Sequence, residues 1–188
     1  MANVIGISGK RGTGKSLLCN PYLKARGFQI FSFADPLKED VRKYYGLSKE
    51  HTDGKLKEVA CDKLGGKTPR EAMIAEGQLR RTFSENGMYW VHKTFQKIKQ
   101  LPKDSLVVIP DVRFKNEAAY ISYMGGHIFR LERHQHLNIY KEVLNDSSET
   151  DLDNYSFALT LPAEKNETPQ DLEKFADSII NYIKGSNK

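Results

Sequence analysis

The sequence has few cysteines and no long apolar run, and each absence excludes a class of protein. Its 188 residues include only two cysteines, far apart and without metal-ligand spacing, which excludes a disulfide-framed domain and favours a reducing, cytoplasmic compartment. No stretch approaches the roughly 20 apolar residues that cross a bilayer, and the mean hydropathy is −0.58. The first residues lack the order of a signal peptide. A membrane partner is therefore not expected.

Internal repeats, low-complexity tracts and Gly/Ser- or Pro-rich linkers are also absent, so one domain over residues 1–188 is expected. Hydrophobic residues make up 39% of the chain, which is enough to form a sizeable core. The formal net charge is +5, which favours an anionic partner: nucleic acid, an anionic membrane surface or a phosphorylated small molecule. Composition does not distinguish these three partners. The positions of the cations along the sequence have to do so.

Short β-prone runs recur along the chain and predict an α/β fold. Two of them, around Val4-Ile5-Gly6-Ile7 and Leu106-Val107-Val108-Ile109, are almost continuously apolar. Strands that are apolar on both faces are typical of the middle of a parallel sheet covered by helices. The five predicted strands are Asn3–Ser8, Gln29–Phe33, Ser105–Pro110, His127–Leu131 and Phe157–Leu161.

Helical patterns lie between these strands. Val91, Phe95 and Ile98 recur at one helical face, and Thr68-Pro69-Arg70-Glu71 has the residue order of a helix start with a capping box. A final helix is expected to begin near Thr168, with Leu172, Phe175, Ile179 and Ile183 on its apolar face and Gly185 at its end. Alternating strands and helices predict a three-layer fold in which a five-stranded parallel sheet is flanked by helices.

The strongest functional signal is a glycine-rich loop after the first strand, which matches the pattern G-x-x-x-x-G-K-[ST]. Glycines let the backbone curl around phosphates with its amide groups pointing inward. Lys15 is expected to reach the β- and γ-phosphates of ATP, and the Ser16 hydroxyl to ligate Mg²⁺. Pro21 is expected to kink the helix that follows. The loop consists of Gly9, Lys10, Arg11, Gly12, Thr13, Gly14, Lys15 and Ser16.

A phosphate loop requires an acidic group at the end of another central strand to hold the shell of the Mg²⁺ ion. Asp111 follows the apolar strand Ser105–Pro110 and is the predicted second metal residue, because ligands of open α/β sheets bind at the carboxyl ends of strands. The alternative is a carboxylate that only caps the turn after the strand.

The stretch Asp111-Val112-Arg113-Phe114-Lys115-Asn116-Glu117 resembles the D-[DV]-R-F-x-N-E motif of the bacteriophage deoxynucleoside monophosphate kinases, within the P-loop kinase superfamily. Further motifs resemble the same family in the correct order. They are Phe31–Lys38 (F-A-x-P-L-K), Lys67–Glu71 (K-T-P-R-E), Tyr89-Trp90-Val91 and Gly125–Arg133 (G-G-x-[IV]-x-R-L-x-R). Ser148-Glu149 stands where an H-x-S-E element is expected, with Asp146 in place of the histidine. The role of Ser148 and Glu149 stays open.

This resemblance implies transfer of the ATP γ-phosphoryl group to a deoxynucleoside monophosphate (dNMP), with Mg²⁺ as cofactor. It also implies a kinase core at residues 1–36, 104–133 and 155–188. A helical acceptor-binding insert is expected at about 37–103 and a lid at about 134–154. The expected partners are ATP and the dNMP; nucleic acid is not expected, and a homodimer is left open.

Phosphoryl transfer requires several cations that converge on the two anionic substrates. Arg130 and Arg133 lie at the end of the fourth predicted strand, and Arg113 follows the metal carboxylate by two positions. These arginines are the candidate catalytic residues beside Lys15. For Arg130 and Arg133 the alternative is pairing with surface carboxylates such as Glu132.

On the acceptor side, guanidinium groups suit a monophosphate because they bind it through two parallel hydrogen bonds. The resemblance favours Arg70 and one of Arg80 and Arg81 as phosphate or base contacts, with a solvated cation at the helix start as the alternative for Arg70. Arg113 would span both phosphate groups, and Lys38 would line the pocket. Asp35 has two interpretations, a contact to the sugar or Arg113 and a stabiliser of the turn before Pro36. Trp90 also has two, a stack on the nucleobase and a core anchor.

Two rival functions fit parts of the pattern. One is a P-loop kinase for another small phosphorylated or alcohol acceptor; the other is a nucleotide-dependent module that binds nucleic acid through Lys93, Lys97, Lys99 and Lys103. No aromatic interleaving accompanies these lysines, so a solvated helix face is the simpler interpretation. His134-x-His136 lacks partners for a metal site, and Cys19 is interpreted as a small packing residue.

Overall fold

The computed structural model describes residues 2–133, 147–163 and 169–186. The chain divides into two compact units. The core unit comprises Met1–Phe31 and Ile98–Lys188, and the helical unit comprises Ser32–Lys97. The helical unit covers nearly the same stretch as the insert expected at about 37–103.

The core unit contains a five-stranded sheet in the order β2-β3-β1-β4-β5, in which every pair of neighbours is parallel. This confirms the predicted fold class. Because β1 has β3 on one side and β4 on the other, the strand order reverses around β1, and ligands of open α/β sheets bind at such a point. The strands are β1 (Asn3–Ser8), β2 (Phe28–Ile30), β3 (Leu106–Ile109), β4 (His127–Arg133) and β5 (Leu159–Ala163).

Several strand boundaries differ from the prediction, most of all in β2 and β5. Strand β2 ends at Ile30 rather than Phe33, because Ser32 and Phe33 form the turn into the next helix, where Ser32 accepts from the amide of Asp35 at 3.1 Å. Strand β5 starts two residues later than expected, at Leu159, where its pairing with Phe129 of β4 begins. It is an edge strand, which accommodates Pro162 within it.

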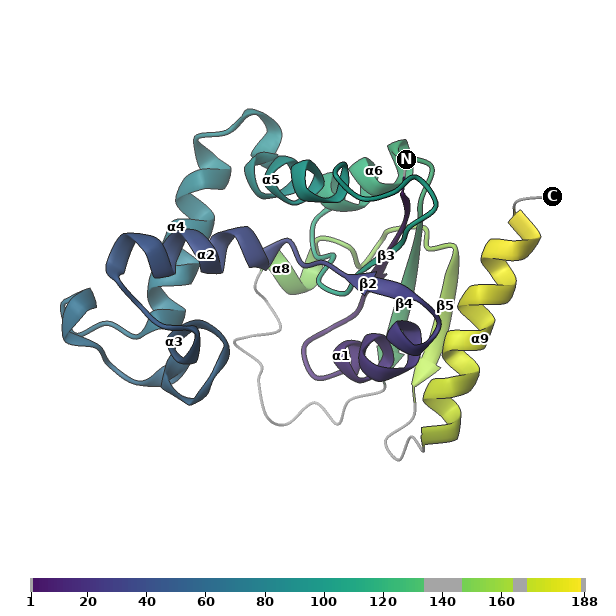
Figure 1. Cartoon of the computed structure of the whole chain (residues 1–188), viewed down its shortest axis with the longest axis horizontal. Coiled ribbons are helices and arrows are strands. Elements are labelled where there is room, and N and C mark those ends of the chain that lie inside the picture. Colours follow the sequence, from purple (N-terminus) through teal and green to yellow (C-terminus); the bar gives the residue numbers. More distant parts are fainter. Residues whose placement is uncertain (1, 134–146, 164–168, 187–188) are drawn as a thin grey trace. The chain divides into compact units, whose positions relative to one another are not determined.

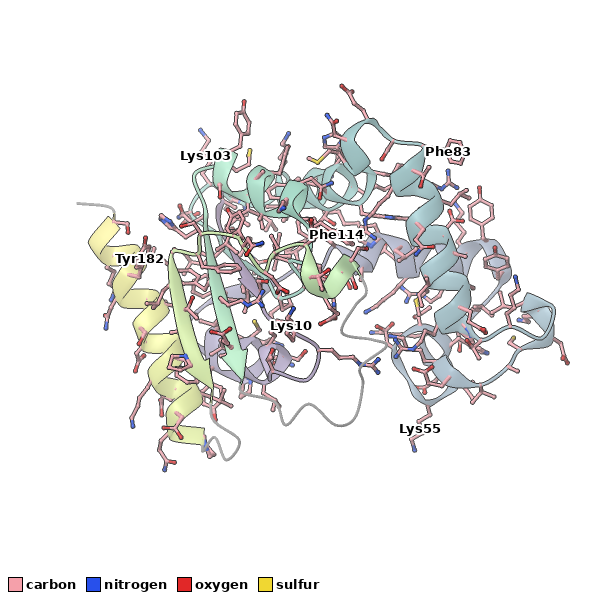
Figure 2. All side chains as sticks on the ribbon, turned by 180° about the vertical axis from the view of Figure 1, so that it is seen from behind. Lys10, Lys55, Phe83, Lys103, Phe114 and Tyr182 are labelled. Atoms are coloured by element: carbon pink, nitrogen blue, oxygen red, sulfur yellow. The ribbon has the colours of Figure 1, made fainter. Side chains whose placement is uncertain are left out.

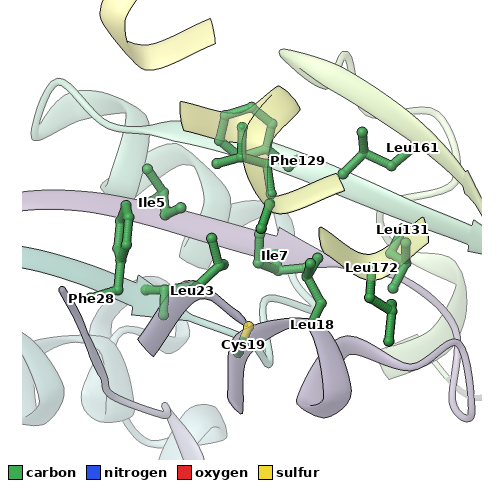
Figure 3. Close-up of a cluster of buried hydrophobic side chains, with 13 residues drawn as sticks. Ile5, Ile7, Leu18, Cys19, Leu23, Phe28, Phe129, Leu131, Leu161 and Leu172 are labelled. Atoms are coloured by element: carbon green, nitrogen blue, oxygen red, sulfur yellow. The ribbon is translucent and has the colours of Figure 1, made fainter. Parts of the chain in front are cut away.

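Apolar side chains pack both faces of the sheet. On one face, Ile5, Ile7 and Phe129 meet residues of the helix after the loop and of the C-terminal helix α9 (Pro169–Ser186), as Figure 3 shows. On the other face, Gly6 leaves room for Ile121 of helix α6 (Lys115–Tyr123), since a Cβ at Gly6 would lie 3.0 Å from it. Figure 1 shows α9 alongside β5. Helices therefore cover both faces, as a three-layer fold requires.

The helix after the phosphate loop is kinked as predicted. It begins as α1 (Lys15–Leu17) and continues as the wider turn η1 (Leu18–Leu23). Asn20, directly before Pro21, has φ −126° and ψ 96°, which is not helical. The proline ring excludes the helical conformation from the residue before it, which accounts for the break. A short helix, α8 (Ser147–Thr150), completes the core unit, and α9 runs past Gly185, where its end was predicted.

The helical unit has no strand among its described residues. Its longest helix, α4, begins with the predicted capping box: Thr68 Oγ1 accepts from the amide of Glu71 at 3.2 Å, and Glu71 accepts from the amide of Thr68 at 2.7 Å. Its elements are α2 (Ala34–Tyr45), α3 (Lys49–Asp53), η2 (Lys55–Glu58), η3 (Asp62–Leu64), α4 (Pro69–Thr82), η4 (Glu85–Gly87) and α5 (Tyr89–Ile98), whose last residue belongs to the core unit. In the described part of the chain, no helix has both the length and the apolarity to cross a bilayer.

Candidate active site

Each of the three glycines in the loop after β1 has a positive φ, which glycine adopts readily. Gly9 has φ +151°, and a Cβ there would lie 2.4 Å from the carbonyl oxygen of Leu131. Gly14 adopts a left-handed conformation, φ 92°, directly before α1. The loop therefore runs close under β4 and then turns into a helix, whose free amide groups attract anions.

The Lys15 side chain folds back over this loop. Its Nζ donates to the backbone oxygen of Gly9 at 2.6 Å and to that of Lys10 at 2.8 Å, and it lies 3.5 Å from Thr13 Oγ1. Thr13 Oγ1 in turn donates to the oxygen of Lys10 at 2.9 Å. The ammonium group thus lies within the loop that is predicted to hold phosphates.

The charges around Lys15 show which side chains the fold brings to the loop. Burial lowers the pKa of Lys15 from 10.5 to about 8, together with the positive charges of Arg113 and Arg130 and against the opposing charges of Glu149 and Asp111. These groups come from the turn after β3, from the middle of β4 and from α8. The positive charges lower the pKa of Lys15 more than the negative charges raise it. A bound anion would therefore stabilise the charged form of Lys15.

Arg130 lies inside the core unit beside the base of the loop. It pairs in register with Ser8, the last residue of β1, and is 8% exposed. Its Nη1 donates to Ser8 Oγ at 3.4 Å, its Nη2 donates to Asp153 at 3.2 Å, and its guanidinium lies 5.3 Å from the centre of the Phe157 ring. Arg130 therefore faces the loop region, where it also pairs with a carboxylate.

Arg113 is held at both ends. Its backbone amide donates to Glu117 Oε2 at 2.8 Å, and Glu117 is buried at the start of α6. Its guanidinium pairs with Glu149 and donates to the backbone oxygen of Ser148 at 3.4 Å. The motif residue Glu117 thus holds the backbone of Arg113, while Glu149 holds its guanidinium.

The predicted metal residues carry oxygen donors near the loop. Asp111 lies in the turn after β3, and its charge acts on both Lys15 and Cys19; Ser16 is exposed in the first turn of α1. Among the described residues, no three His, Cys, Asp or Glu side chains form a metal cluster. Magnesium commonly takes one or two protein oxygens and completes its shell with phosphates and water. The two donors fit that pattern.

Two carboxylates near α8 complete the site, and neither was assigned from the sequence. Lys10 Nζ donates to Asp153 at 2.6 Å and to the backbone oxygen of Glu149 at 2.5 Å; Lys10 is labelled in Figure 2. Glu149 Oε2 accepts from the amide of Arg11 at 2.8 Å. The Ser148-Glu149 element marked this segment, whereas nothing in the sequence marked Asp153.

The helical unit carries a separate group of cations, which includes two predicted acceptor residues. Lys38 pairs with Asp53 at 2.6 Å, and Arg70 pairs with Glu58. Burial, followed by the charges of Arg70 and Lys38, lowers the pKa of Lys57. Lys57 therefore belongs to this group. The sequence did not predict it, because it lies in a stretch with many other charged residues.

Arg80 lies well away from Arg70 on α4. It follows Arg70 by ten positions in α4, which separates their backbones by about 15 Å along the helix axis. Arg80 pairs with Glu76 at 2.7 Å, and its guanidinium lies 5.5 Å from the centre of the Tyr89 ring. Arg81, one position on, is half-buried. The role of one of Arg80 and Arg81 as a phosphate or base contact stays a prediction.

Trp90 and Asp35 have structural roles in the helical unit. Trp90 is 1% exposed, and its indole N–H donates to the backbone oxygen of Gly77 at 3.2 Å, so it has no open face for a nucleobase. Asp35 Oδ2 accepts from the amide of Ser32 at 3.0 Å at the start of α2. For Trp90 the structure shows the core anchor. Asp35 makes the turn contact and also lies 3.9 Å from Lys38 Nζ through Oδ1, and its contact with the sugar or Arg113 stays a prediction.

Some predicted features lie outside the described residues. These are the side chain of Arg133, the segment 134–146 of the expected lid, and the His134-x-His136 pair. Two of the lysines considered for nucleic acid pair within the helical unit: Lys93 with Asp40 at 3.4 Å and Lys97 with Glu39 at 2.6 Å. Cys19 is buried in the core, and burial raises its pKa to about 12.

Comparison with known proteins adds a relative with a similar sequence. A protein of Acanthamoeba polyphaga mimivirus named "Putative deoxynucleotide monophosphate kinase" is 33% identical over 142 residues, which are 69% of this chain and 74% of the relative. The chain belongs to the deoxynucleotide monophosphate kinase family. The relative comes from a giant virus, whereas the sequence motifs resemble bacteriophage members. No family model matches the chain.

A second relative of the kinase carries no functional name. It is "Uncharacterized protein ORF76" of Ictalurid herpesvirus 1 (strain Auburn), 26% identical over 155 residues. The match covers 81% of this chain and 57% of the relative, so the kinase spans little more than half of that protein.

Solved structures show the same fold. Protein TT1252 from Thermus thermophilus superposes with a TM-score of 0.54 at 17% identity, covering 96% of this chain and 97% of that one. Dephospho-CoA kinase from Campylobacter jejuni superposes with a TM-score of 0.53 at 16% identity over the full length of both chains. The family relative and the P-loop kinase fold together support a nucleotide kinase, a phosphotransferase.

Proposed function

We propose that this kinase transfers the γ-phosphoryl group of MgATP to the 5′-phosphate of a dNMP, giving ADP and the deoxynucleoside diphosphate (dNDP). The observation that carries the proposal is the gathering of Lys15, Arg113 and Arg130 around a glycine loop. The 33% identical relative supports the choice of acceptor, because its name assigns a deoxynucleotide monophosphate.

The chemistry explains why cations are the main requirement. An oxygen of the acceptor phosphate bonds to the γ-phosphorus while the bond from that phosphorus to the β–γ bridging oxygen breaks, and negative charge passes to ADP. Lys15, Arg113 and Arg130, together with the loop amides, stabilise that charge. A monophosphate is already ionised at neutral pH, so no general base is needed. The role of Asp35 as a turn stabiliser agrees with this mechanism.

The Ser16 hydroxyl and the Asp111 carboxylate would hold Mg²⁺, as the sequence predicts. When bound, the ion neutralises charge on the β- and γ-phosphates. Asp111 acts electrostatically on Lys15, so both donors belong to the loop region.

The acceptor phosphate would bind to Lys38, Lys57 and Arg70 of the helical unit. Arg70 supplies a planar fork for two phosphate oxygens, and the two lysines supply charge. Lys57 has its pKa lowered by burial and by the other two cations. A phosphate dianion there would relieve the repulsion among the three.

The test is a panel of dNMPs and ribonucleoside monophosphates incubated with MgATP, in which ADP and the diphosphate are both measured. The proposal expects at least one dNMP to yield its dNDP in a 1:1 ratio with ADP, and Lys15→Ala to abolish transfer with an unchanged melting temperature. Small alcohols, other phosphorylated acceptors and DNA are included in the panel. Turnover with only one of these acceptors, or ATP hydrolysis that depends on DNA, would replace the proposal with the corresponding rival.

A further inference from the structure

The carboxylate of Glu149 joins the phosphate loop to Arg113. Its side chain is 4% exposed. One oxygen, Oε1, pairs with Arg113 Nη1, and the other, Oε2, accepts from the backbone amide of Arg11 at 2.8 Å. Each oxygen thus has its own partner, one on the loop after β1 and one beyond the end of β3.

A carboxylate buried to this extent is costly unless it is paired and hydrogen-bonded. Glu149 meets that condition only because Arg113 and the Arg11 amide converge on it. Its charge also raises the pKa of Lys15, against the effects of burial and of Arg113. Glu149 therefore balances part of the positive charge that the site gathers.

Anchoring of α8 does not require this carboxylate. The same segment is attached through the backbone oxygen of Glu149, which accepts from Lys10 at 2.5 Å, and through Asp153, which also accepts from Lys10. Asp151 Oδ2 accepts from the amide of Lys115 at 2.7 Å. These contacts hold α8 against the loop and α6, so the buried carboxylate has a separate effect.

We propose that Glu149 is a positioning residue that fixes the Arg113 guanidinium at the phosphate loop before nucleotide binds. The backbone of Arg113 is fixed by Glu117 at 2.8 Å, and its side chain by Glu149. Among the described residues, the contacts given for the guanidinium use Nη1, and on this proposal Nε and Nη2 donate to the transferring phosphoryl group. A preorganised cation stabilises transition-state charge without paying for its ordering during the reaction. The inference rests on the proposed function for the role of Arg113.

The test compares Glu149→Gln, which keeps the size of the side chain but removes its charge, with Asp151→Asn in the same segment. Each variant is titrated with MgADP alone and with MgADP plus aluminium fluoride, a mimic of the transferring phosphoryl group. Glu149→Gln is expected to bind MgADP within about twofold of the wild type and the fluoride complex at least tenfold more weakly. In turnover, kcat falls at least tenfold and KM for ATP stays within about threefold. Asp151→Asn leaves all four quantities near the wild type.

A double-mutant cycle separates positioning from a general structural effect. In an Arg113→Lys background, Glu149→Gln should cause little further loss, because the partner it positions is already altered. Glu149→Asp keeps the charge and restores part of kcat, and this variant carries the test if Glu149→Gln melts at a lower temperature.

Equal losses for MgADP and the fluoride complex, or full additivity with Arg113→Lys, would overturn the inference. If the wild-type protein phosphorylates no dNMP, but Glu149→Gln still weakens binding of the fluoride complex and not of MgADP, then the proposed function is wrong and the role of Glu149 stands.

Discussion

At the scale of single residues, Lys15 shows how the fold prepares the loop for an anion. Its ammonium group is surrounded by backbone oxygens of the loop, yet burial and two arginines lower its pKa to about 8. Near pH 8, where about half of Lys15 is neutral, the loop therefore gains positive charge when phosphate binds. Cys19 shows the opposite effect of burial, because burial raises the pKa of its thiol to about 12 and leaves it uncharged.

Nucleotide binding should therefore take up a proton. At pH 8.5, above the pKa of about 8 in the free protein, Lys15 is mostly neutral; bound phosphates raise its pKa, so it becomes protonated. We expect an uptake of roughly 0.5–0.8 protons per MgATP at pH 8.5 and almost none at pH 6.5, where Lys15 is already charged. Calorimetry in buffers of different ionisation enthalpy measures this number. Lys15→Arg, with a permanent charge, is the control; uptake that persists in it assigns the proton to another group.

Some residues of the site could be predicted from the sequence and others could not. Lys15 and Asp111 were found because fixed spacing after an apolar strand places them at the sheet edge. Glu149 was noticed only through a motif that assigned no role, and Lys57 not at all, since the partners that define both residues come from distant parts of the chain. Trp90 carried two interpretations because a tryptophan side chain suits both a buried core and a stack on a nucleobase.

At the scale of elements, the residues at the start of helix α4 themselves determine where that helix begins. Thr68 and Glu71 exchange hydrogen bonds in the predicted capping box. The amide and hydroxyl of Thr68 lower the pKa of Glu71. A carboxylate with a lowered folded-state pKa stabilises the fold at neutral pH, and that contribution disappears as the pH falls through the lowered value.

Removal of this cap should destabilise the protein by a moderate amount. Thr68→Ala leaves the amide of Glu71 without its hydroxyl acceptor, so we expect the free energy of unfolding to fall by about 1 kcal/mol. Chemical denaturation at pH 7 measures it, with Thr68→Ser as the variant that keeps the cap. A Thr68→Ala protein as stable as Thr68→Ser would contradict the role of the box.

Elements were predicted better than their ends. All five strands were found because alternating apolar runs and turn signals are local, and the kink before Pro21 follows from the proline ring alone. The ends of β2 and β5 were misplaced because pairing with a neighbouring strand sets them. Gly185 did not end α9, because glycine permits a helix end without requiring one.

At the scale of the whole molecule, the cations behind the net charge of +5 gather in two groups. Lys15, Arg113 and Arg130 lie at the loop of the core unit, and Lys38, Lys57 and Arg70 lie in the helical unit. The lysines of α5 that suggested nucleic acid pair with carboxylates of α2. Cations therefore gather in both places where phosphate-bearing substrates are proposed to bind, with carboxylates paired to several of them.

This division of charge predicts separable kinetic effects. Arg70→Met and Lys57→Met should each raise KM for the dNMP about tenfold or more, since a charge-assisted hydrogen bond to phosphate contributes about 1.5–3 kcal/mol. KM for ATP should stay within about twofold of the wild type. Steady-state kinetics with each substrate varied in turn measures both constants, and Lys55→Met, an exposed lysine of the same turn, is the matched control. A parallel rise in KM for ATP would show that the two units do not divide the substrates in this way.

The most direct test of the central claim is a single-turnover reaction with excess enzyme, ATP labelled at the γ-phosphate and each of the four dNMPs in turn. The proposal predicts that the label moves to the β-position of a dNDP, with one ADP formed for each label transferred, and that Lys15→Ala shows no transfer. Label recovered only as inorganic phosphate, or retained in ATP with all four dNMPs, would contradict the claim that this chain is a deoxynucleoside monophosphate kinase.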